Sequence, residues 1–197
     1  MAIRRYLANA DNTITNAFEY NLSTRGTGSN MGASDVSEVF TIYGQASSSS
    51  LEIARILTQF PVTSITSDRA AGTIPASGSV SFFLRMYNAV HSETVPRSFS
   101  LNVSAVKKSW EEGIGLDMEG YTDLTYDATG SNWQRASKSA AWTSAGGDFY
   151  SDTSSSFSAS FTTGVEDLEV DITTLVEQWL NSAGNVLGSK SNYGVIV

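Results

Sequence analysis

Apolar residues alternate with polar residues along much of the chain, and this period of two predicts β-strands. The alternation is clearest over residues 98–106, where Phe99, Leu101 and Val103 are separated by serine or asparagine. A segment of this kind is expected to lie half-exposed in an antiparallel sheet. The same criterion predicts strands over residues 11–20, 36–43, 51–60, 80–90, 98–106, 154–162 and 193–197.

The strand predicted over residues 80–90 is the most apolar, and a short connection containing Pro96 separates it from residues 98–106. Two strong strands joined in this way predict a hairpin. Residues 3–7 are expected to be either a first strand or an exposed arm. The pattern fails over residues 107–147, which are expected to form a long loop region or an insertion.

A single helix is predicted near the C-terminus, over residues 171–180. Ile172, Leu175, Val176 and Trp179 follow the spacing of one helical face, and residues 168–172 lead into it. A helix this short is marginal in isolation. Its apolar face is therefore expected to pack on a surface formed by the rest of the chain.

Composition supports a mostly β chain. The 197 residues suffice for one domain with a sizeable core, and 41% are hydrophobic while only 16% are charged. The net charge of -8 would repel nucleic-acid phosphates and anionic membrane surfaces, so neither is an expected partner. The absence of cysteine excludes disulfides and thiolate metal sites. The first residues lack the apolar core of a secretory signal, and no apolar run approaches the roughly 20 residues that span a bilayer.

Catalytic and metal-binding patterns are weak. His91 is the single histidine, so neither a Ser-His-Asp triad nor a histidine metal site is expected, and its expected role is structural or at the surface. Acidic residues between 111 and 127 either supply oxygen ligands to calcium or form a solvated loop; their spacing does not fit an EF-hand, which favours the loop. No catalytic residue, metal or cofactor is therefore predicted. The acidic residues are Glu111, Glu112, Asp117, Glu119, Asp123 and Asp127.

Four aromatic residues of the irregular region are the candidate ligand-binding residues, because aromatic rings stack on sugar faces or anchor protein interfaces. Exposure of at least three of them along one groove would favour glycan binding, whereas burial against a protein neighbour would favour a structural role. Trp110 and Trp179 are instead expected in the core. The four candidates are Tyr121, Tyr126, Trp133 and Trp142.

The order of several short motifs resembles the DNRLRE family, surface β-sandwich modules that are grouped with carbohydrate-binding modules. The most telling pair is the loop Gly146-Gly147-Asp148-Phe149 followed by the helix that ends in Trp179-Leu180. Together the motifs cover most of the chain. The others are Ala10-Asp11-Asn12, Ser29-Asn30-Met31-Gly32, Ala54-Arg55-Ile56-Leu57, Phe83-Leu84-Arg85-Met86-Tyr87, Ser109-Trp110-Glu111-Glu112, Asn132-Trp133 and Asn192-Tyr193-Gly194.

The sequence departs from the family pattern in two places. A loop insertion around residues 113–131 separates two tryptophan motifs that are close together in similar domains. A binding surface built from this loop would therefore be specific to this protein. The family pattern also continues with at least one strand beyond Asn192-Tyr193-Gly194. A final strand is therefore expected either to be missing or to come from a partner.

The strand pattern and the resemblance together predict an all-β fold, an antiparallel two-sheet jelly-roll-like β-sandwich with one short C-terminal amphipathic helix. It is expected to be a single domain over residues 1–197. Arg55 and Arg85 alternate with apolar residues and are expected to be buried beside carboxylates. The predicted core comprises Ile53, Ile56, Phe82, Leu84, Leu101, Val103, Phe161, Leu175 and Trp179.

A surface-type module without cysteine or a secretion signal is similar to virion structural proteins of tailed phages, including marine phages. This implies a non-enzymatic decoration, neck or tail-associated protein, assembled in the host cytoplasm and exposed on the particle. Its partners would be other virion proteins and copies of itself, joined through unpaired strand edges. The alternative function is a carbohydrate-binding module that recognises host surface polysaccharide, and a polysaccharide lyase or hydrolase comes third.

Overall fold

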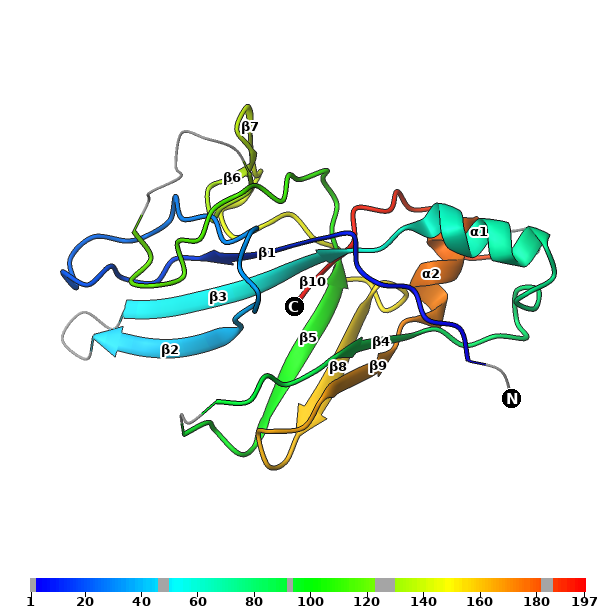
Figure 1. The fold of residues 1–197 in the computed structure, drawn as a ribbon, viewed down its shortest axis with the longest axis horizontal. Helices are drawn as coiled ribbons and strands as arrows, with labels where there is room; N and C mark the ends of the chain where they lie inside the picture. The colour runs from blue at the N-terminus through cyan, green and yellow to red at the C-terminus, as the bar shows by residue number, and fades with distance from the viewer. Residues whose placement is uncertain (1–2, 46–49, 92–93, 123–129, 182–185) are drawn as a thin grey trace. The chain divides into compact units, whose positions relative to one another are not determined.

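The computed structural model describes residues 3–45, 50–91, 94–122, 130–181 and 186–197, and Figure 1 shows their arrangement. The chain is mostly β with antiparallel pairing, which confirms the predicted fold class at this level. No helix of the described segments has the length and apolar character needed to cross a membrane. The strands are β1 (Ala10–Thr15), β2 (Phe40–Gln45), β3 (Ser50–Gln59), β4 (Phe83–Met86), β5 (Phe99–Ala105), β6 (Arg135–Ser137), β7 (Ala140–Ala141), β8 (Ser156–Phe161), β9 (Leu168–Asp171) and β10 (Val195–Ile196); the helices are α1 (Val62–Ala70) and α2 (Thr173–Leu180).

Each strand predicted by alternation overlaps an observed strand, but several observed strands are shorter than expected. β1 ends at Thr15 because the side chain of Asn16 takes over the next bond, with its Oδ1 accepting the Ile53 amide at 2.7 Å. Residues 3–7 form no strand and are an arm, in which the side chains of Ile3 and Leu7 are exposed. A run of serines at residues 47–50 was expected to form a hairpin loop; residues 47–49 lie outside the described residues, and Ser50 begins β3.

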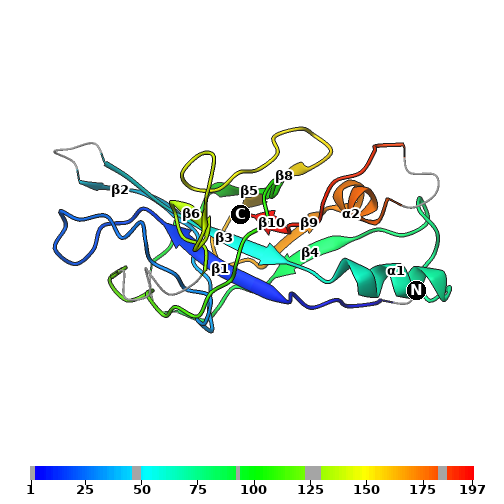
Figure 2. The ribbon, with the colours of Figure 1, turned by 90° about the horizontal axis from the view of Figure 1, so that it is seen from above.

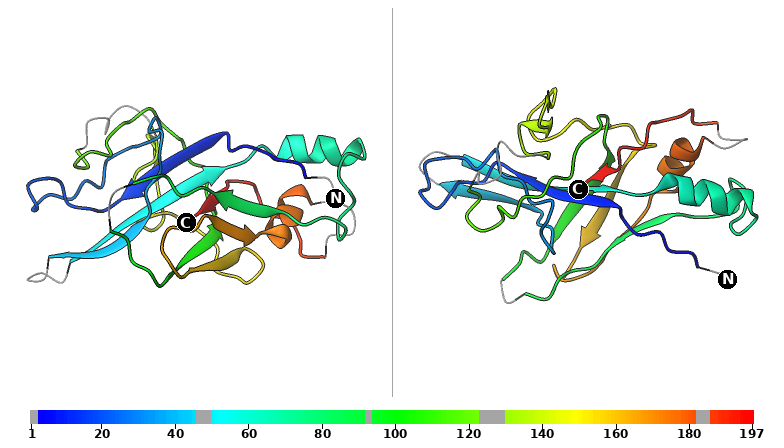
Figure 3. Two further views of the ribbon diagram at one scale, coloured as in Figure 1. Left: turned by 60° about the horizontal axis from the view of Figure 1, so that its bottom comes forward. Right: turned by 45° about the horizontal axis from the view of Figure 1, so that its top comes forward.

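The predicted hairpin between residues 80–90 and 98–106 is wrong. β4 pairs with β9, and β5 pairs with β8, both antiparallel; Figure 3 shows β5 (green) and β8 (yellow) side by side. The register of β5 and β8 sets the Phe99 and Phe161 rings in a stack with centroids 4.7 Å apart, and it places serine opposite serine on the other face. Matched alternation makes these cross-strand pairs favourable, so the distant partner replaces the local one.

The chain forms two compact units, each assembled from three separate segments. Unit 1 comprises residues 1–7, 60–105 and 150–192, and unit 2 comprises residues 8–59, 106–149 and 193–197. The single domain expected from length is thus organised as two groups of contacts.

In unit 2, β3 is the central strand, as seen from above in Figure 2. β1 pairs antiparallel with the second half of β3, whereas β2 pairs with its first half and β10 with Leu57 and Thr58. A tryptophan-rich cluster forms the core beside this sheet. Its buried members are Ile14, Leu57, Val106, Trp110, Trp133, Ala136, Trp142 and Ile196.

In unit 1, α2 forms where the apolar spacing predicts a helix, and it ends at Asn181, which adopts a left-handed conformation with φ of 44°. α1 was not predicted, because its sequence VTSITSDRA has no apolar stripe and only Ile65 is buried. The helix contacts α2 and is fixed by an ion pair between Arg69 and Glu177, with nitrogen to oxygen distances of 2.7 and 2.9 Å. The contact with α2 therefore provides the stabilisation that the local sequence of α1 lacks.

The predicted core is largely confirmed. Trp110 and Trp179 are both buried, and His91 lies exposed at the surface. The other predicted core residues that are buried are Ile56, Leu84, Val103, Phe161 and Leu175. The partly buried ones are Ile53, Phe82 and Leu101.

A carboxylate of unit 1 gives this unit a pH dependence. Hydrogen bonds from the hydroxyls of Ser154 and Ser155, with Lys190 nearby, lower the pKa of Asp152 to about 2 from an ordinary value of 3.8. A depressed pKa stabilises the fold above pH 3.8, and this contribution is lost as the pH falls through 2. We therefore expect Asp152→Asn to lower the melting temperature at neutral pH. The difference in melting temperature from the unmodified protein should shrink below pH 3.8. A constant difference down to pH 2 would contradict the stabilising role of the ionised Asp152 carboxylate.

Candidate functional site

The structure places two of the four candidate aromatic residues together in a buried cluster. Trp133 and Trp142 are only 8% and 5% exposed and belong to the core of unit 2. Tyr121 is partly buried, and Tyr126 lies outside the described residues. The groove with at least three exposed rings, expected for a glycan-binding site, is therefore not formed by this set.

Two buried indole groups of unit 2, those of Trp110 and Trp142, donate hydrogen bonds. Trp142 donates its Nε1 proton to the carbonyl of Asn132, and Trp110 donates to the carbonyl of Tyr193, both at 2.8 Å. Satisfied indoles in a packed cluster are typical of core tryptophans rather than of a ligand platform.

Arg55 is held by aromatic rings instead of the predicted carboxylate. Its guanidinium lies 5.1 Å from the Trp133 ring centre and 5.4 Å from that of Phe149, and it donates to the carbonyl of Gly146. Burial lowers the pKa of Arg55, although the group stays charged at neutral pH. Arg85 does pair with a carboxylate, that of Glu169 at 2.8 Å, but this pair is exposed. The prediction of two buried arginine–carboxylate pairs is therefore wrong.

A hollow of about 500 Å³ opens next to the Gly146-Gly147-Asp148-Phe149 loop. The loop keeps its shape because the Asp148 carboxylate accepts the amides of Thr143 and Ser144 at 2.9 and 3.0 Å. Burial opposes ionisation of Asp148, but these amide bonds and the charge of Lys108 outweigh it and lower its pKa. The hollow is lined by Lys107, Lys108, Thr143, Ser144, Gly147, Asp148 and Phe149.

The described part of the segment 113–131, which was predicted to be an insertion, is anchored by Asn30. Its Nδ2 donates to the carbonyls of Glu112 and Ser131 at 2.7 and 2.8 Å, and its Oδ1 accepts the amide of Gly115 at 2.7 Å. A Cβ atom on Gly113 would lie only 2.4 Å from the Asn30 side chain, so glycine is needed for this approach. Both ends of the segment 113–131 are therefore held by hydrogen bonds to one buried side chain, that of Asn30.

The acidic stretch is only partly a solvated loop. Asp117 is 1% exposed and accepts the amide of Asn30 at 3.1 Å, whereas Glu111 and Glu119 are exposed. Burial and the charge of Glu112 raise the pKa of Asp11. Within the described residues, no group of three or more His, Cys, Asp or Glu side chains is placed to hold a metal ion, and Asp123 and Asp127 lie outside them.

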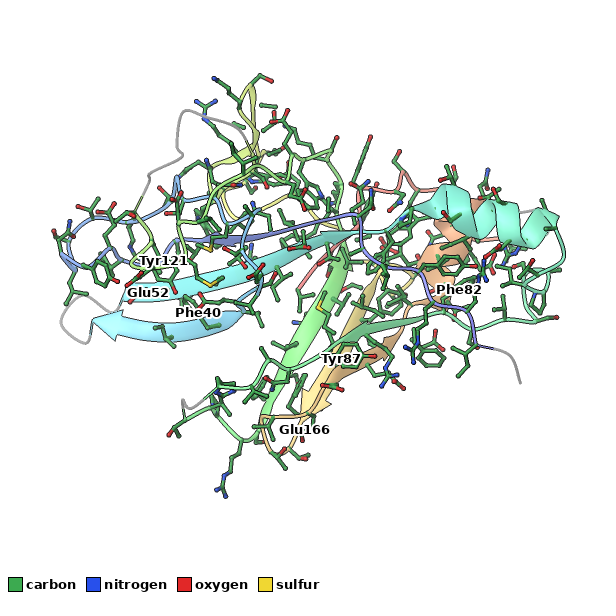
Figure 4. All side chains as sticks on the ribbon, viewed as in Figure 1. Phe40, Glu52, Phe82, Tyr87, Tyr121 and Glu166 are labelled. Atoms are coloured by element: carbon green, nitrogen blue, oxygen red, sulfur yellow. The ribbon has the colours of Figure 1, made fainter. Side chains whose placement is uncertain are left out.

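Tyr121 connects the insertion to the start of β2. Its ring centre is 6.2 Å from that of Phe40, and its hydroxyl donates to a carboxylate oxygen of Glu38 at 3.1 Å. Figure 4 shows Tyr121, Phe40 and Glu52 gathered at one end of unit 2. Burial, followed by the charges of Glu38 and Glu52, raises the pKa of Tyr121, so its hydroxyl remains a proton donor. Tyr121 therefore positions a strand in addition to being a candidate ligand residue.

β2 is the strand that this contact positions. Among the described residues it pairs with β3 alone. Its sequence, FTIYGQ, contains no charged residue and no proline, the devices by which edge strands usually avoid pairing with other chains. Thr41 is exposed, and Ile42 is 50% exposed. The strand predicted over residues 36–43 includes Glu38, so neither the uncharged bounds of β2 nor its position in the sheet could be seen in the sequence.

No match was found for this chain among models of protein families, curated proteins or solved structures.

Removing the Tyr121 hydroxyl tests its positioning role. We expect Tyr121→Phe to lower the free energy of unfolding by about 1–2 kcal/mol, because the Glu38 carboxylate loses a partly buried donor. Urea unfolding followed by circular dichroism measures the change. Tyr87→Phe is the matched control, since Tyr87 is 68% exposed and should change stability by less than about 0.5 kcal/mol. Equal effects of the two substitutions would contradict the role of the hydroxyl.

Proposed function

We propose that this chain is a DNRLRE-type module with a jelly-roll-like β-sandwich fold and a non-enzymatic, structural role in the virion of a tailed phage. It would be a decoration, neck or tail-associated protein that is exposed on the particle. Its partners would be other virion proteins and copies of itself, with no role for nucleic acid or membrane. Assembly would use β-sandwich surfaces, as in modules that share strands across subunits.

The observation that carries this proposal is the open, uncharged edge of β2. An unprotected edge strand is a template for pairing with another chain, and soluble proteins usually block such edges. Burial of Trp133 and Trp142 supports the same choice, because the rings proposed for stacking on sugars instead stabilise the core. The short motifs that resemble the family, including the loop at residues 146–149, are the basis for the choice of module.

The direct test is to look for the protein in the particle. Antibodies raised against the purified chain should label purified virions of the phage that carries the gene, and mass spectrometry of those virions should detect its peptides in several copies. Its absence from washed, intact particles would overturn the structural role.

A second function is favoured by the hollow beside residues 146–149. Phe149 is 36% exposed at its rim, and lysine, hydroxyl and carboxylate groups line it, which is a chemistry that suits a host surface polysaccharide. Binding to a polysaccharide array that is abolished by Phe149→Ala, but retained by Tyr87→Ala in unit 1, would favour this function. No binding by the unmodified protein would remove it.

A further inference from the structure

We propose that β2 of one copy pairs antiparallel with β2 of a second copy, giving a dimer with two-fold symmetry. This inference deepens the proposed structural role and rests on it, because it names the partner and the strand through which copies associate. Four properties of the described residues carry it: one-sided pairing, absence of charge, exposed central side chains and a fixed backbone.

The pairing surface is the free edge of a regular strand. β2 is hydrogen-bonded to β3 in continuous register from Phe40 to Tyr43, and an irregularity follows only between Tyr43 and Gln45. The opposite edge pairs with no other strand among the described residues. A strand of this length offers several backbone groups to an incoming strand.

The composition of β2 fits its own copy. When a strand pairs antiparallel with itself, each charged residue near the centre meets a like charge, which is destabilising. β2 has no charged residue, so this penalty does not arise. The exposed Ile42 would meet Ile42 or Thr41 of the partner, which buries apolar surface.

The net charge of the chain favours an uncharged strand edge as the contact between copies. The protein carries a net charge of -8, so two copies repel one another across most of their surfaces. An uncharged edge is where that repulsion is weakest. Because the same strand is used by both copies, the contact closes after two subunits and does not propagate into fibres.

The strand is also held in place before association. Phe40 contacts the Tyr121 ring, and the amide of Glu38 donates to the Thr13 hydroxyl on β1 at 3.0 Å. Together with the ladder to β3, these contacts fix the start of β2. A preorganised edge loses less entropy when it binds.

Cysteine scanning tests the pairing directly, since the chain has no native cysteine. Thr41→Cys and Ile42→Cys variants, alone and mixed, are oxidised and separated on non-reducing gels. Crosslinked dimer from Ile42→Cys alone places the symmetry axis at residue 42, and dimer only from the mixture places it between residues 41 and 42. Ser160→Cys, at an exposed position on β8, is the matched control and should stay monomeric. No crosslink in any sample from residues 41 and 42 would overturn the proposal.

Charge exchange gives a second, independent readout by light scattering. Ile42→Lys and Ile42→Glu should each be monomeric, with the dissociation constant raised about tenfold or more by like charges at the interface. An equal mixture of the two should recover the dimer, which also shows that both variants are folded. Ile114→Lys, at a 68% exposed position elsewhere in unit 2, should leave dimerisation unchanged.

The outcomes separate this proposal from the wider one. A monomeric unmodified protein, or a dimer insensitive to both charges at residue 42, would overturn β2 pairing. The virion role would then still be decided by labelling of particles, because a monomer is able to bind other virion proteins.

Discussion

Replacing Trp133 by alanine is expected to lower the free energy of unfolding by about 3–5 kcal/mol, which is typical when a large buried ring is removed. The ring is 8% exposed and packs in the core of unit 2, and it also supports the Arg55 guanidinium 5.1 Å from its centre. Its removal leaves a cavity beside a partly buried cation. Urea unfolding followed by far-ultraviolet circular dichroism measures the loss without depending on the fluorescence of the missing indole.

Ile114→Ala is the control for this substitution, because Ile114 is an apolar residue of the same unit that is 68% exposed. Its effect should stay within about 0.5 kcal/mol. A Trp133→Ala loss below about 1 kcal/mol would contradict a core role, since buried aromatic residues do not give such small values. That outcome would return Trp133 to the set of candidate ligand residues.

Removing the carboxylate of Glu177 is expected to lower the stability of unit 1 by about 3–5 kcal/mol, because the largely buried Arg69 side chain loses its ionic partner. The two side chains are only 7% and 13% exposed, respectively. The helix that carries Arg69 buries little apolar surface, so this pair is its main attachment to α2. We expect Glu177→Ala to expose α1 to amide hydrogen exchange before the rest of the unit.

The exposed pair of Arg85 and Glu169 provides the matched control. Its nitrogen to oxygen distance is 2.8 Å, close to the 2.7 Å of the buried pair, but both side chains are about half exposed. Glu169→Ala should therefore cost no more than about 1 kcal/mol. A double substitution, Arg69→Met with Glu177→Leu, should recover much of the loss by replacing charges with apolar packing. Equal losses of stability from Glu177→Ala and Glu169→Ala would show that burial does not determine the strength of these ion pairs.

Local patterns in the sequence predicted local structure well. The alternation at residues 98–106 and 154–162 gave two strands, and the stripe formed by Leu175, Val176 and Trp179 gave a helix with those residues buried. These features depend on residue spacing alone. The partner of each strand does not, which is why the hairpin predicted around Pro96 proved wrong and β4 pairs with β9 instead.

Contacts between distant residues account for the other differences. α1 depends on Glu177, more than a hundred residues away, and its own sequence has no signal that reveals this. Arg55 was expected beside a carboxylate, but Trp133 and Phe149 surround it, and sequence does not show which groups fold onto a given side chain. Composition similarly marked Trp133 and Trp142 as candidates without showing that they are buried.

The interleaved segments of the two units have a consequence for how the protein is made. Leu57 and Thr58 pair with Val195 and Ile196, so the central strand β3 lacks one of its partners until residues more than a hundred positions later have been added. Contacts of such long sequence separation fold slowly. A chain emerging from the ribosome therefore exposes part of β3 until residues 195–196 have been synthesised. Unit 2 is expected to finish folding only after these residues leave the ribosome, and the growing chain to depend on chaperones at that strand.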